Sequence, residues 1–255
     1  MDVYAILKEL ITISRELGRE DRQLAILGEG NSSADCGDGT FWVKASGSQL
    51  GTIDESGFSR CSHEAVTALL NKDSLTQQQI AEGLLGTLLD KSHRKPSVET
   101  FLHSICLSQP DIKWVGHTHP VSVNQFLCSQ LGAKPFMRHL FPDEIVVCGI
   151  EPLVIPYIDP GLKLSQAIRD ELMRYQDRIG TSPKMILMEN HGLIALGKTS
   201  KDVLNIQFMA DKFARILWGT YALGGPNYLP QEQVDYLDNR LDEIYRRRLL
   251  AQGTP

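Results

Sequence analysis

Apolar residues recur three or four positions apart along several segments, which is the period of an amphipathic helix. The first such segment covers residues 2–18 and stops at Gly18. A further helix is expected after Pro96, with Ser97 as a candidate N-cap. The same pattern predicts helices at residues 62–70, 75–89, 121–131, 162–179, 201–221 and 231–249.

Shorter apolar runs, bounded by turn residues, predict strands between these helices. Residues 33–45 are expected to form a hairpin that turns at Gly37-Asp38-Gly39. Further strands are predicted at residues 112–116, 144–147, 153–155, 184–188 and 193–196. With helices at both ends and between strands, and no linker or repeat, we expect one domain over residues 1–255. Its helices would pack on both faces of one mixed sheet, the α/β class.

Composition narrows the range of functions. The 255 residues are 42% hydrophobic and 22% charged, as in ordinary globular proteins, so folding does not require a metal staple. The net charge is -5 and the basic residues are scattered, apart from Arg246-Arg247-Arg248, which argues against nucleic-acid binding. There is no apolar run of about 20 residues and no signal-peptide pattern. We therefore expect a cytoplasmic protein with no membrane partner.

The five cysteines are odd in number and show no CxxC spacing, which argues against a disulfide framework or a thiolate zinc site. Each is interpreted as a small buried apolar residue.

Two histidines follow directly after the strand predicted at residues 112–116. His117 and His119 are two residues apart, so in extended chain they project to the same side, about 6–7 Å from each other. Imidazole suits zinc and its neighbours, and a catalytic site has three protein ligands and one open position. By itself the HxH pattern is weak, because surface histidines also fall into this spacing.

His191 is a candidate third ligand. It lies in a polar turn between two apolar strands, where Gly192 would allow a close backbone approach or a positive φ. The alternative is a hairpin tip exposed to water.

Glu99 is expected in the first turn of the helix that follows Pro96. A negative charge is favourable at a helix N-terminus, so Glu99 would either stabilise the helix through its dipole or transfer protons beside a metal. His103, one helical turn on, is interpreted as a packing residue or a support for the site.

Five short motifs in order resemble the class II aldolase and adducin-head family, in particular fuculose-phosphate aldolases. They lie between about residues 28 and 197: Gly30-Asn31-Ser32, Ser46-Gly47, Pro96-Ser97-Val98-Glu99, His117-Thr118-His119-Pro120 and Asn190-His191-Gly192-Leu193. This resemblance implies a three-layer α/β/α sandwich with a mixed, mostly antiparallel central sheet, assembled as a homotetramer.

The resemblance also implies roles for the candidate residues. His117, His119 and His191 would hold zinc or another divalent transition metal, and Glu99 would be the catalytic acid/base. The metal would act as a Lewis acid toward the sugar oxygens and stabilise the enediolate that forms when a carbon–carbon bond breaks.

A substrate phosphate is implied to lie against Asn31, Ser46, Gly47 and Ser97, because small residues expose converging N–H donors. Aldolases of the family have Ser-Ser-Glu where this chain has Ser-Val-Glu. Val98 removes one hydroxyl ligand, so either backbone groups compensate or the anionic end of the substrate differs.

Other polar residues are candidates for the site. Tyr228 and Tyr236 are candidates for the acid that protonates the leaving aldehyde, with helix packing as the preferred interpretation. His139 and the pair Asp143-Glu144 would reach the pocket from a loop, and an ordinary surface role is preferred for each.

The leading functional hypothesis is a metal-dependent aldolase that cleaves a ketose 1-phosphate to dihydroxyacetone phosphate and an aldehyde. A sugar-phosphate dehydratase or epimerase would use the same metal site. A different class of protein, a non-catalytic binding module like the adducin head, is the third hypothesis, although it has no reason to keep three metal histidines and a carboxylate together.

Overall fold

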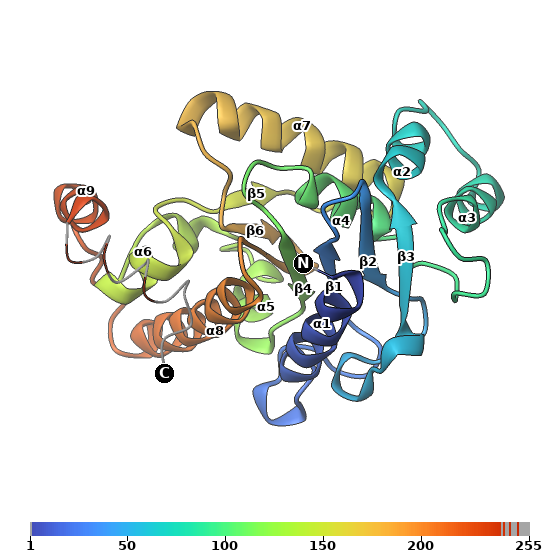
Figure 1. Cartoon of the computed structure of the whole chain (residues 1–255). Coiled ribbons are helices and arrows are strands. Elements are labelled where there is room, and N and C mark those ends of the chain that lie inside the picture. Colours follow the sequence, from blue (N-terminus) through green and yellow to red (C-terminus); the bar gives the residue numbers. More distant parts are fainter. Residues whose placement is uncertain (1, 241, 243–244, 246–248, 250–255) are drawn as a thin grey trace.

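The computed structural model describes residues 2–240, 242, 245 and 249, and its centre is a seven-stranded sheet in the order β3-β2-β1-β4-β7-β6-β5 (Figure 1). All neighbouring strands are antiparallel except β5 and β6, which are parallel. The mixed, mostly antiparallel sheet expected from the sequence is therefore confirmed. The strands are β1 (Asn31–Asp35), β2 (Thr40–Lys44), β3 (Phe58–Ser62), β4 (Trp114–Thr118), β5 (Leu153–Ile155), β6 (Met185–Met188) and β7 (Gly192–Gly197).

Helices cover both faces of this sheet, which gives the three layers that the sequence predicted (Figure 1). One face packs against α1 (Val3–Leu17), α5 (Val121–Leu127) and α8 (Ser200–Ala222). The other packs against α4 (Thr100–Leu107) and α7 (Leu162–Ile179), with α2 (His63–Leu70) resting on both of these helices. The remaining helical segments are α3 (Gln77–Gly86), α6 (Pro142–Cys148), α9 (Gln231–Asn239), and the short 3-10 turns Glu20–Arg22, Leu50–Thr52, Glu55–Gly57 and Lys134–Met137.

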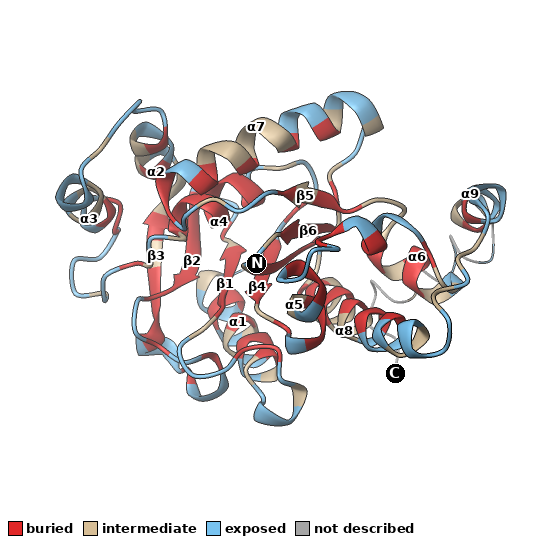
Figure 2. Ribbon diagram, turned by 180° about the vertical axis from the view of Figure 1, so that it is seen from behind, coloured by how far each residue is buried: buried red, intermediate tan, exposed pale blue. Residues whose placement is uncertain are grey.

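Alternation along the strands separates two hydrophobic cores. On β4, Trp114 belongs to the core beneath α1 and α8, whereas Val115 belongs to the core beneath α4 and α7. The neighbouring strand β7 divides in the same way, with Ala195 in the first core and Ile194 in the second. Because both faces are apolar, the central strands are buried throughout, as Figure 2 shows.

The strand predicted at residues 144–147 is wrong, because this segment lies within helix α6. Pro142 occupies the first turn, where its missing N–H costs nothing, and Asp143 and Glu144 lie there too, next to the positive end of the helix dipole. These start signals outweigh the β-branched run that suggested a strand.

Several predicted boundaries need correction. Helix α5 ends at Leu127 rather than at residue 131, α3 is shorter at both ends than the predicted 75–89, and strand β3 was not predicted. The helix after Pro96 begins at Thr100 with Glu99 as its N-cap residue, so Ser97 does not cap it. Of the helix predicted at residues 231–249, α9 accounts for 231–239; most of the remainder, with Arg246-Arg247-Arg248, lies outside the described residues.

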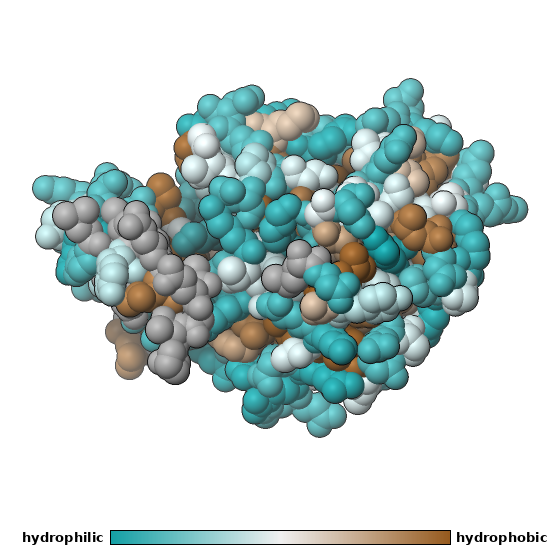
Figure 3. Space-filling model, in the orientation of Figure 1, coloured by the Kyte–Doolittle hydropathy of each residue, from teal (hydrophilic) through white to brown (hydrophobic). Residues whose placement is uncertain are grey.

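Four of the five cysteines are buried as predicted, and Cys128 is exposed. Within the described part of the chain, no helix is both long enough and apolar enough to span a membrane. On the face drawn in Figure 3, hydrophilic side chains predominate and hydrophobic ones form small scattered groups.

Gly18, just after α1, allows a close backbone approach to Gly51. A Cβ at this position would lie 2.1 Å from the Gly51 nitrogen, which is backbone and cannot rotate away. We expect Gly18→Ala to lower the free energy of unfolding by about 1–3 kcal/mol through overpacking. Gly219→Ala, inside α8 with open space around it, should instead be neutral or stabilising. Urea denaturation of both variants checks this, and an unchanged Gly18→Ala midpoint would contradict it.

Candidate functional site

His117 is placed by the register of the central strands. It pairs with Asn31 of β1 on one side and Ile194 of β7 on the other, so it shares the α4 face of the sheet with Ile194. Its side chain is fully buried, and Nδ1 donates a hydrogen bond of 3.0 Å to the Leu193 carbonyl. Nδ1 carries that proton, so Nε2 is the atom that offers a lone pair when the ring is neutral. Burial lowers the pKa of this imidazole in the metal-free protein, but the Glu99 carboxylate outweighs burial and raises it.

His119 follows directly after β4, and its backbone N–H is held by the Leu24 carbonyl at 2.8 Å. Its Nε2 lies 3.0 Å from Nε2 of His117. Its Nδ1 faces the Glu29 carboxylate at 3.8 Å, which favours a proton on Nδ1 and a lone pair on Nε2. Gly192 makes room for the ring, since a Cβ there would lie 2.7 Å from His119 Cδ2.

His191 occupies the turn between β6 and β7, beside Asn190, whose φ of 55° is left-handed. The Asn124 side chain donates to the His191 carbonyl at 3.0 Å and fixes the turn from helix α5. The structure therefore brings His117, His119 and His191 together, with one ligand atom from each lying within 4.8 Å of the others.

The donor set fits a bound divalent metal. Side-chain exposure is 0% for His117, 10% for His191 and 23% for His119, so the cluster opens toward solvent on the His119 side. Within the described residues, the buried atoms Asn31 Oδ1 and His191 Nδ1 have no hydrogen-bond partner. Buried polar groups are normally paired, so the cluster fits a bound ion or ligand better than a closed hydrogen-bond network.

Glu99 faces this cluster from the start of α4. Its Oε1 lies 3.5 Å from His117 Nε2 and 3.3 Å from His191 Nε2, and Asn31 donates a hydrogen bond to Oε2. Burial opposes ionisation of this carboxyl, but His117 and His191 outweigh burial and hold its pKa well below the usual range. The group is thus an ionised carboxylate beside three imidazoles.

His103 lies one turn further along α4 and is completely buried. Its Nδ1 and the Ser33 hydroxyl form a hydrogen bond of 2.7 Å, which ties the helix to β1. Burial and the neighbouring His117 lower its pKa to about 3, so the ring is neutral at physiological pH. It supports the site from behind, in agreement with its interpretation from sequence.

Lys44, at the end of β2, was missed by the sequence analysis. Only 3% of it is exposed, and its Nζ donates to the Gly28 carbonyl at 3.1 Å. Burial lowers the pKa of this amine, while the charge of Glu99 raises it. A lysine inside a predicted strand, between Val43 and Ala45, is the signal that would have found it, because polar residues are rare in strands buried on both faces.

Of the four predicted anion-binding residues, Asn31 begins strand β1, and Ser46, Gly47 and Ser97 lie along two adjoining loops. The bridge between Ala45 and Pro96 joins these loops, and the Ser46 N–H donates to the Lys95 carbonyl at 2.9 Å. Gly47 has a φ of +76°, which explains why glycine occupies the turn. The Ser97 hydroxyl accepts a hydrogen bond from the Glu99 N–H at 3.3 Å and so connects this loop to the histidine cluster.

The other polar candidates lie in different surroundings. The Arg138 guanidinium covers the Tyr228 ring at 4.3 Å, and Tyr236 is 60% exposed on α9. The surface role preferred for His139 and Glu144 is wrong, because both are buried and paired at 2.7 Å. The pair stabilises the start of α6.

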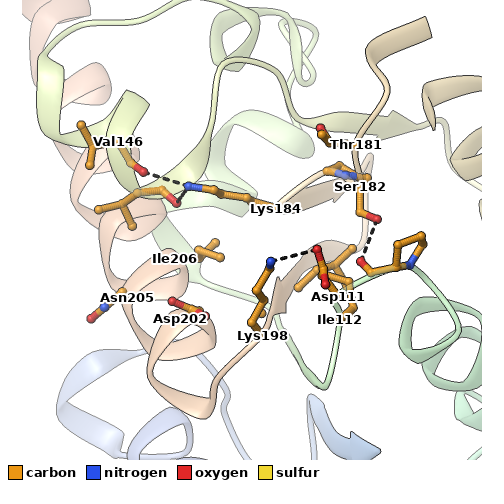
Figure 4. Close-up of a pocket in the computed structure, with 15 residues that line it drawn as sticks. Asp111, Ile112, Val146, Thr181, Ser182, Lys184, Lys198, Asp202, Asn205 and Ile206 are labelled. Atoms are coloured by element: carbon orange, nitrogen blue, oxygen red, sulfur yellow. Dashed lines mark hydrogen bonds and ion pairs between the residues drawn. The ribbon is translucent and has the colours of Figure 1, made fainter. Parts of the chain in front are cut away.

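A cavity of about 510 Å³ lies at the opposite end of β4 and β7 from the histidines. Figure 4 shows its lining residues, which include the apolar Ile112 and Ile206, and Lys184 donating to the Val146 carbonyl at 2.8 Å. None of the histidine cluster contributes to its wall, so this cavity is separate from the candidate site.

Comparison of the sequence with known families and proteins agrees with this geometry. The model of the Class II Aldolase and Adducin N-terminal domain matches residues 8–218. An uncharacterized oxidoreductase of Bacillus subtilis, YuxG, is 29% identical over 202 residues, which are 76% of this chain and 27% of that protein. A 5-methylthioribulose-1-phosphate/5-deoxyribulose-1-phosphate aldolase of Rhodospirillum rubrum is 28% identical over 144 residues. That match covers 56% of this chain and 60% of the aldolase, so the chain spans less than two thirds of either relative.

Solved structures share the fold. The N-terminal class II aldolase domain of a conserved Thermoplasma acidophilum protein has a TM-score of 0.63 and 28% identity, covering 81% of this chain and 92% of that one. An L-fuculose 1-phosphate aldolase has a TM-score of 0.69 at 19% identity, covering 95% and 98% of the two chains.

Acid should destabilise the metal-free protein through His103. In the unfolded chain this imidazole binds a proton below about pH 6.5, whereas in the folded chain it stays neutral down to a pKa of about 3. The unfolded state thus binds more protons in this window, and the free energy of unfolding should fall by about 1.4 kcal/mol per pH unit as pH decreases. Urea titrations between pH 4 and 7 give the free energy of unfolding at each pH. Its dependence on pH should correspond to one proton fewer in His103→Asn than in the unmodified protein. Parallel slopes in the two proteins would contradict this assignment.

Gly192→Ala should disrupt the cluster and, because its closest contact is with backbone, also lower the free energy of unfolding. Its Cβ would lie 2.5 Å from the Thr118 carbonyl oxygen and 2.7 Å from His119 Cδ2, so the His119 ring must shift. We expect zinc affinity to fall by about 10- to 100-fold, measured by competition with a chelator, while circular dichroism keeps its native shape. Gly86→Ala, with open space around its Cβ, is the control and should bind zinc normally.

Proposed function

The chain belongs to the class II aldolase and adducin N-terminal domain family, and from this premise we propose that it is a metal-dependent aldolase acting on a ketose 1-phosphate. The observation that carries the proposal is the convergence of three imidazoles and an ionised carboxylate at one end of the sheet. The relative from Rhodospirillum rubrum, named as an aldolase of two ketose 1-phosphates, supports the choice of substrate class.

We assign the metal to His117, His119 and His191, with zinc or another divalent transition metal as the ion. When bound, the ion supplies Lewis-acid chemistry that polarises oxygen atoms of the sugar. The Leu193 carbonyl and Glu29 carboxylate orient two of the imidazoles from behind, so both lone pairs face the same point.

Glu99 is assigned the proton transfer. In the cleavage direction, the Glu99 carboxylate accepts the proton of the hydroxyl on the fourth carbon, and the bond between the third and fourth carbons breaks. Its electron pair stays on the three-carbon fragment as an enediolate, while an aldehyde leaves. Glu99, after taking up a proton, delivers it to the third carbon and completes dihydroxyacetone phosphate. Asn31 donates to Oε2, which leaves Oε1 facing His117 and His191 at the candidate metal position.

Asn31, Ser46, Gly47 and Ser97 are assigned to the phosphate end of the substrate. The bridge between Ala45 and Pro96 supports this assignment because it sets the Ser46-Gly47 turn against the loop that leads to Glu99. A homotetramer, as in the family, remains part of the proposal, and sedimentation of the purified chain measures it.

Two other functions keep the same site. A dehydratase would release water from the sugar phosphate, and an epimerase would invert one carbon without releasing a fragment. An adducin-like binding module would carry the fold without chemistry. The Glu99 carboxylate faces two of the candidate metal ligands. Burying a charge costs free energy, and a binding module without chemistry gives no reason to keep one here, so this carboxylate favours an enzyme.

Product analysis separates these functions. We expect zinc-loaded protein to release dihydroxyacetone phosphate from 5-deoxyribulose 1-phosphate, measured by coupled reduction with glycerol-phosphate dehydrogenase. Glu99→Gln should keep its zinc and lower kcat by about 10²- to 10⁴-fold. Glu171→Gln, on the outer side of α7, controls for the loss of one negative charge. A dehydrated or epimeric product would replace the aldolase assignment by one of the alternatives, and no metal binding at all would favour the binding module.

A further inference from the structure

Arg94 lies over the Ser46-Gly47 turn and was not singled out by the sequence. One nitrogen of its guanidinium donates to the Ser48 hydroxyl at 3.1 Å, and the other donates to the Ser46 carbonyl at 3.3 Å. The second nitrogen would also lie 3.5 Å from a Cβ at Gly47. Two fixed contacts therefore hold the end of this exposed side chain against the turn.

The guanidinium has no carboxylate partner among the residues that the structure describes. Among the described residues, none of the ion pairs includes Arg94. Its charge is felt at Lys44, whose pKa it lowers, and Lys44 in turn interacts with Glu99. Two cations thus lie near each other at this edge of the site, and one of them, Lys44, interacts with Glu99.

Free backbone N–H groups in the turn itself are scarce. The Ser46 N–H is used by the Lys95 carbonyl. The Gly47 N–H has no acceptor within the part of the chain that the structure describes. Val98, on the adjoining loop, presents an apolar side chain that is 42% exposed. An anion placed here would meet the Gly47 N–H and the Ser46 and Ser97 hydroxyls, and Arg94 adds a positive charge and N–H groups beyond those used in its two contacts.

We propose that Arg94 holds the anionic end of the substrate and thereby selects charged over uncharged ketoses. A planar guanidinium matches a phosphate or carboxylate with two parallel hydrogen bonds, which a lysine cannot reproduce. The anion would lie between the guanidinium, the Gly47 N–H and the Ser97 loop, on the path from solvent to Glu99. The substrate part of this inference rests on the proposed aldolase function; the binding of the anion does not.

Inorganic phosphate is the probe that tests anion binding without any activity. Calorimetric titration of the zinc-loaded full-length chain should show saturable phosphate binding that weakens by about 10- to 100-fold in Arg94→Gln. Arg94→Lys keeps the charge but loses the fork, and should recover only part of the affinity. Arg174→Gln, on the exposed surface of α7, removes the same charge far from the turn and should bind phosphate like the unmodified protein. Acetate in place of phosphate distinguishes a carboxylate site from a phosphate site.

A merely structural role for Arg94 gives a different pattern. If it only braced the turn, Ser48→Ala, which removes one brace and keeps the charge, would weaken phosphate binding as much as Arg94→Gln does. The unfolding midpoint would also fall in both. Equal phosphate affinity in Arg94→Gln and the unmodified chain would overturn the proposal.

Kinetics then separate this inference from the function itself. With an active enzyme, Arg94→Gln should raise KM for the ketose 1-phosphate and leave KM for the unphosphorylated ketose unchanged. An equal rise for both substrates would overturn the role in selection. If no aldolase activity is found but phosphate binding depends on Arg94, the proposed function fails and the anion site stands.

Discussion

The antiparallel pairing of β4 with β7 is the constraint on which the candidate site depends. It sets Thr118 opposite Leu193, so the chain leaving β4 meets the turn that enters β7. His119 and His191 come together only because these two strand ends coincide. A shift of β4 by one residue in this register would turn His117 to the α8 face of the sheet. It would also move each apolar side chain of the strand to the opposite core. Since β4 is the middle strand of seven, both cores resist such a shift.

Electrostatics then requires the members of the site to be present together. The buried Glu99 carboxylate is tolerated because His117, His191 and Asn31 surround it. The imidazoles in turn need orientation from behind, which the Leu193 carbonyl supplies for His117. Removing one partner leaves a buried polar group unsatisfied, so the cost of a single substitution exceeds the strength of the contact that it deletes.

The long helices and the candidate site residues could be predicted from the sequence. The way in which these residues meet in the folded chain could be predicted only in part. The spacing of His117 and His119 indicated a shared direction, and the turn around His191 indicated a strand end. The segment 144–147 was misread because β-branched residues favour strands, while the local start signals at Pro142 decided for a helix. Lys44 and Arg94 were missed because each acquires its surroundings from residues distant in the chain.

Residues that could be predicted and residues that were missed differ in how the fold places them. The histidines and Asn31 lie on or beside paired strands, where one register fixes several side chains at once. Arg94 and Val98 lie on the loop before α4, where each side chain is placed by its own few contacts. A loop can change residue without disturbing the sheet, so a ligand-binding loop can vary while the geometry of the histidine cluster remains. The residues proposed to perform chemistry are thus readable from short motifs, whereas Arg94, proposed to select the substrate, must be found from contacts in the folded chain.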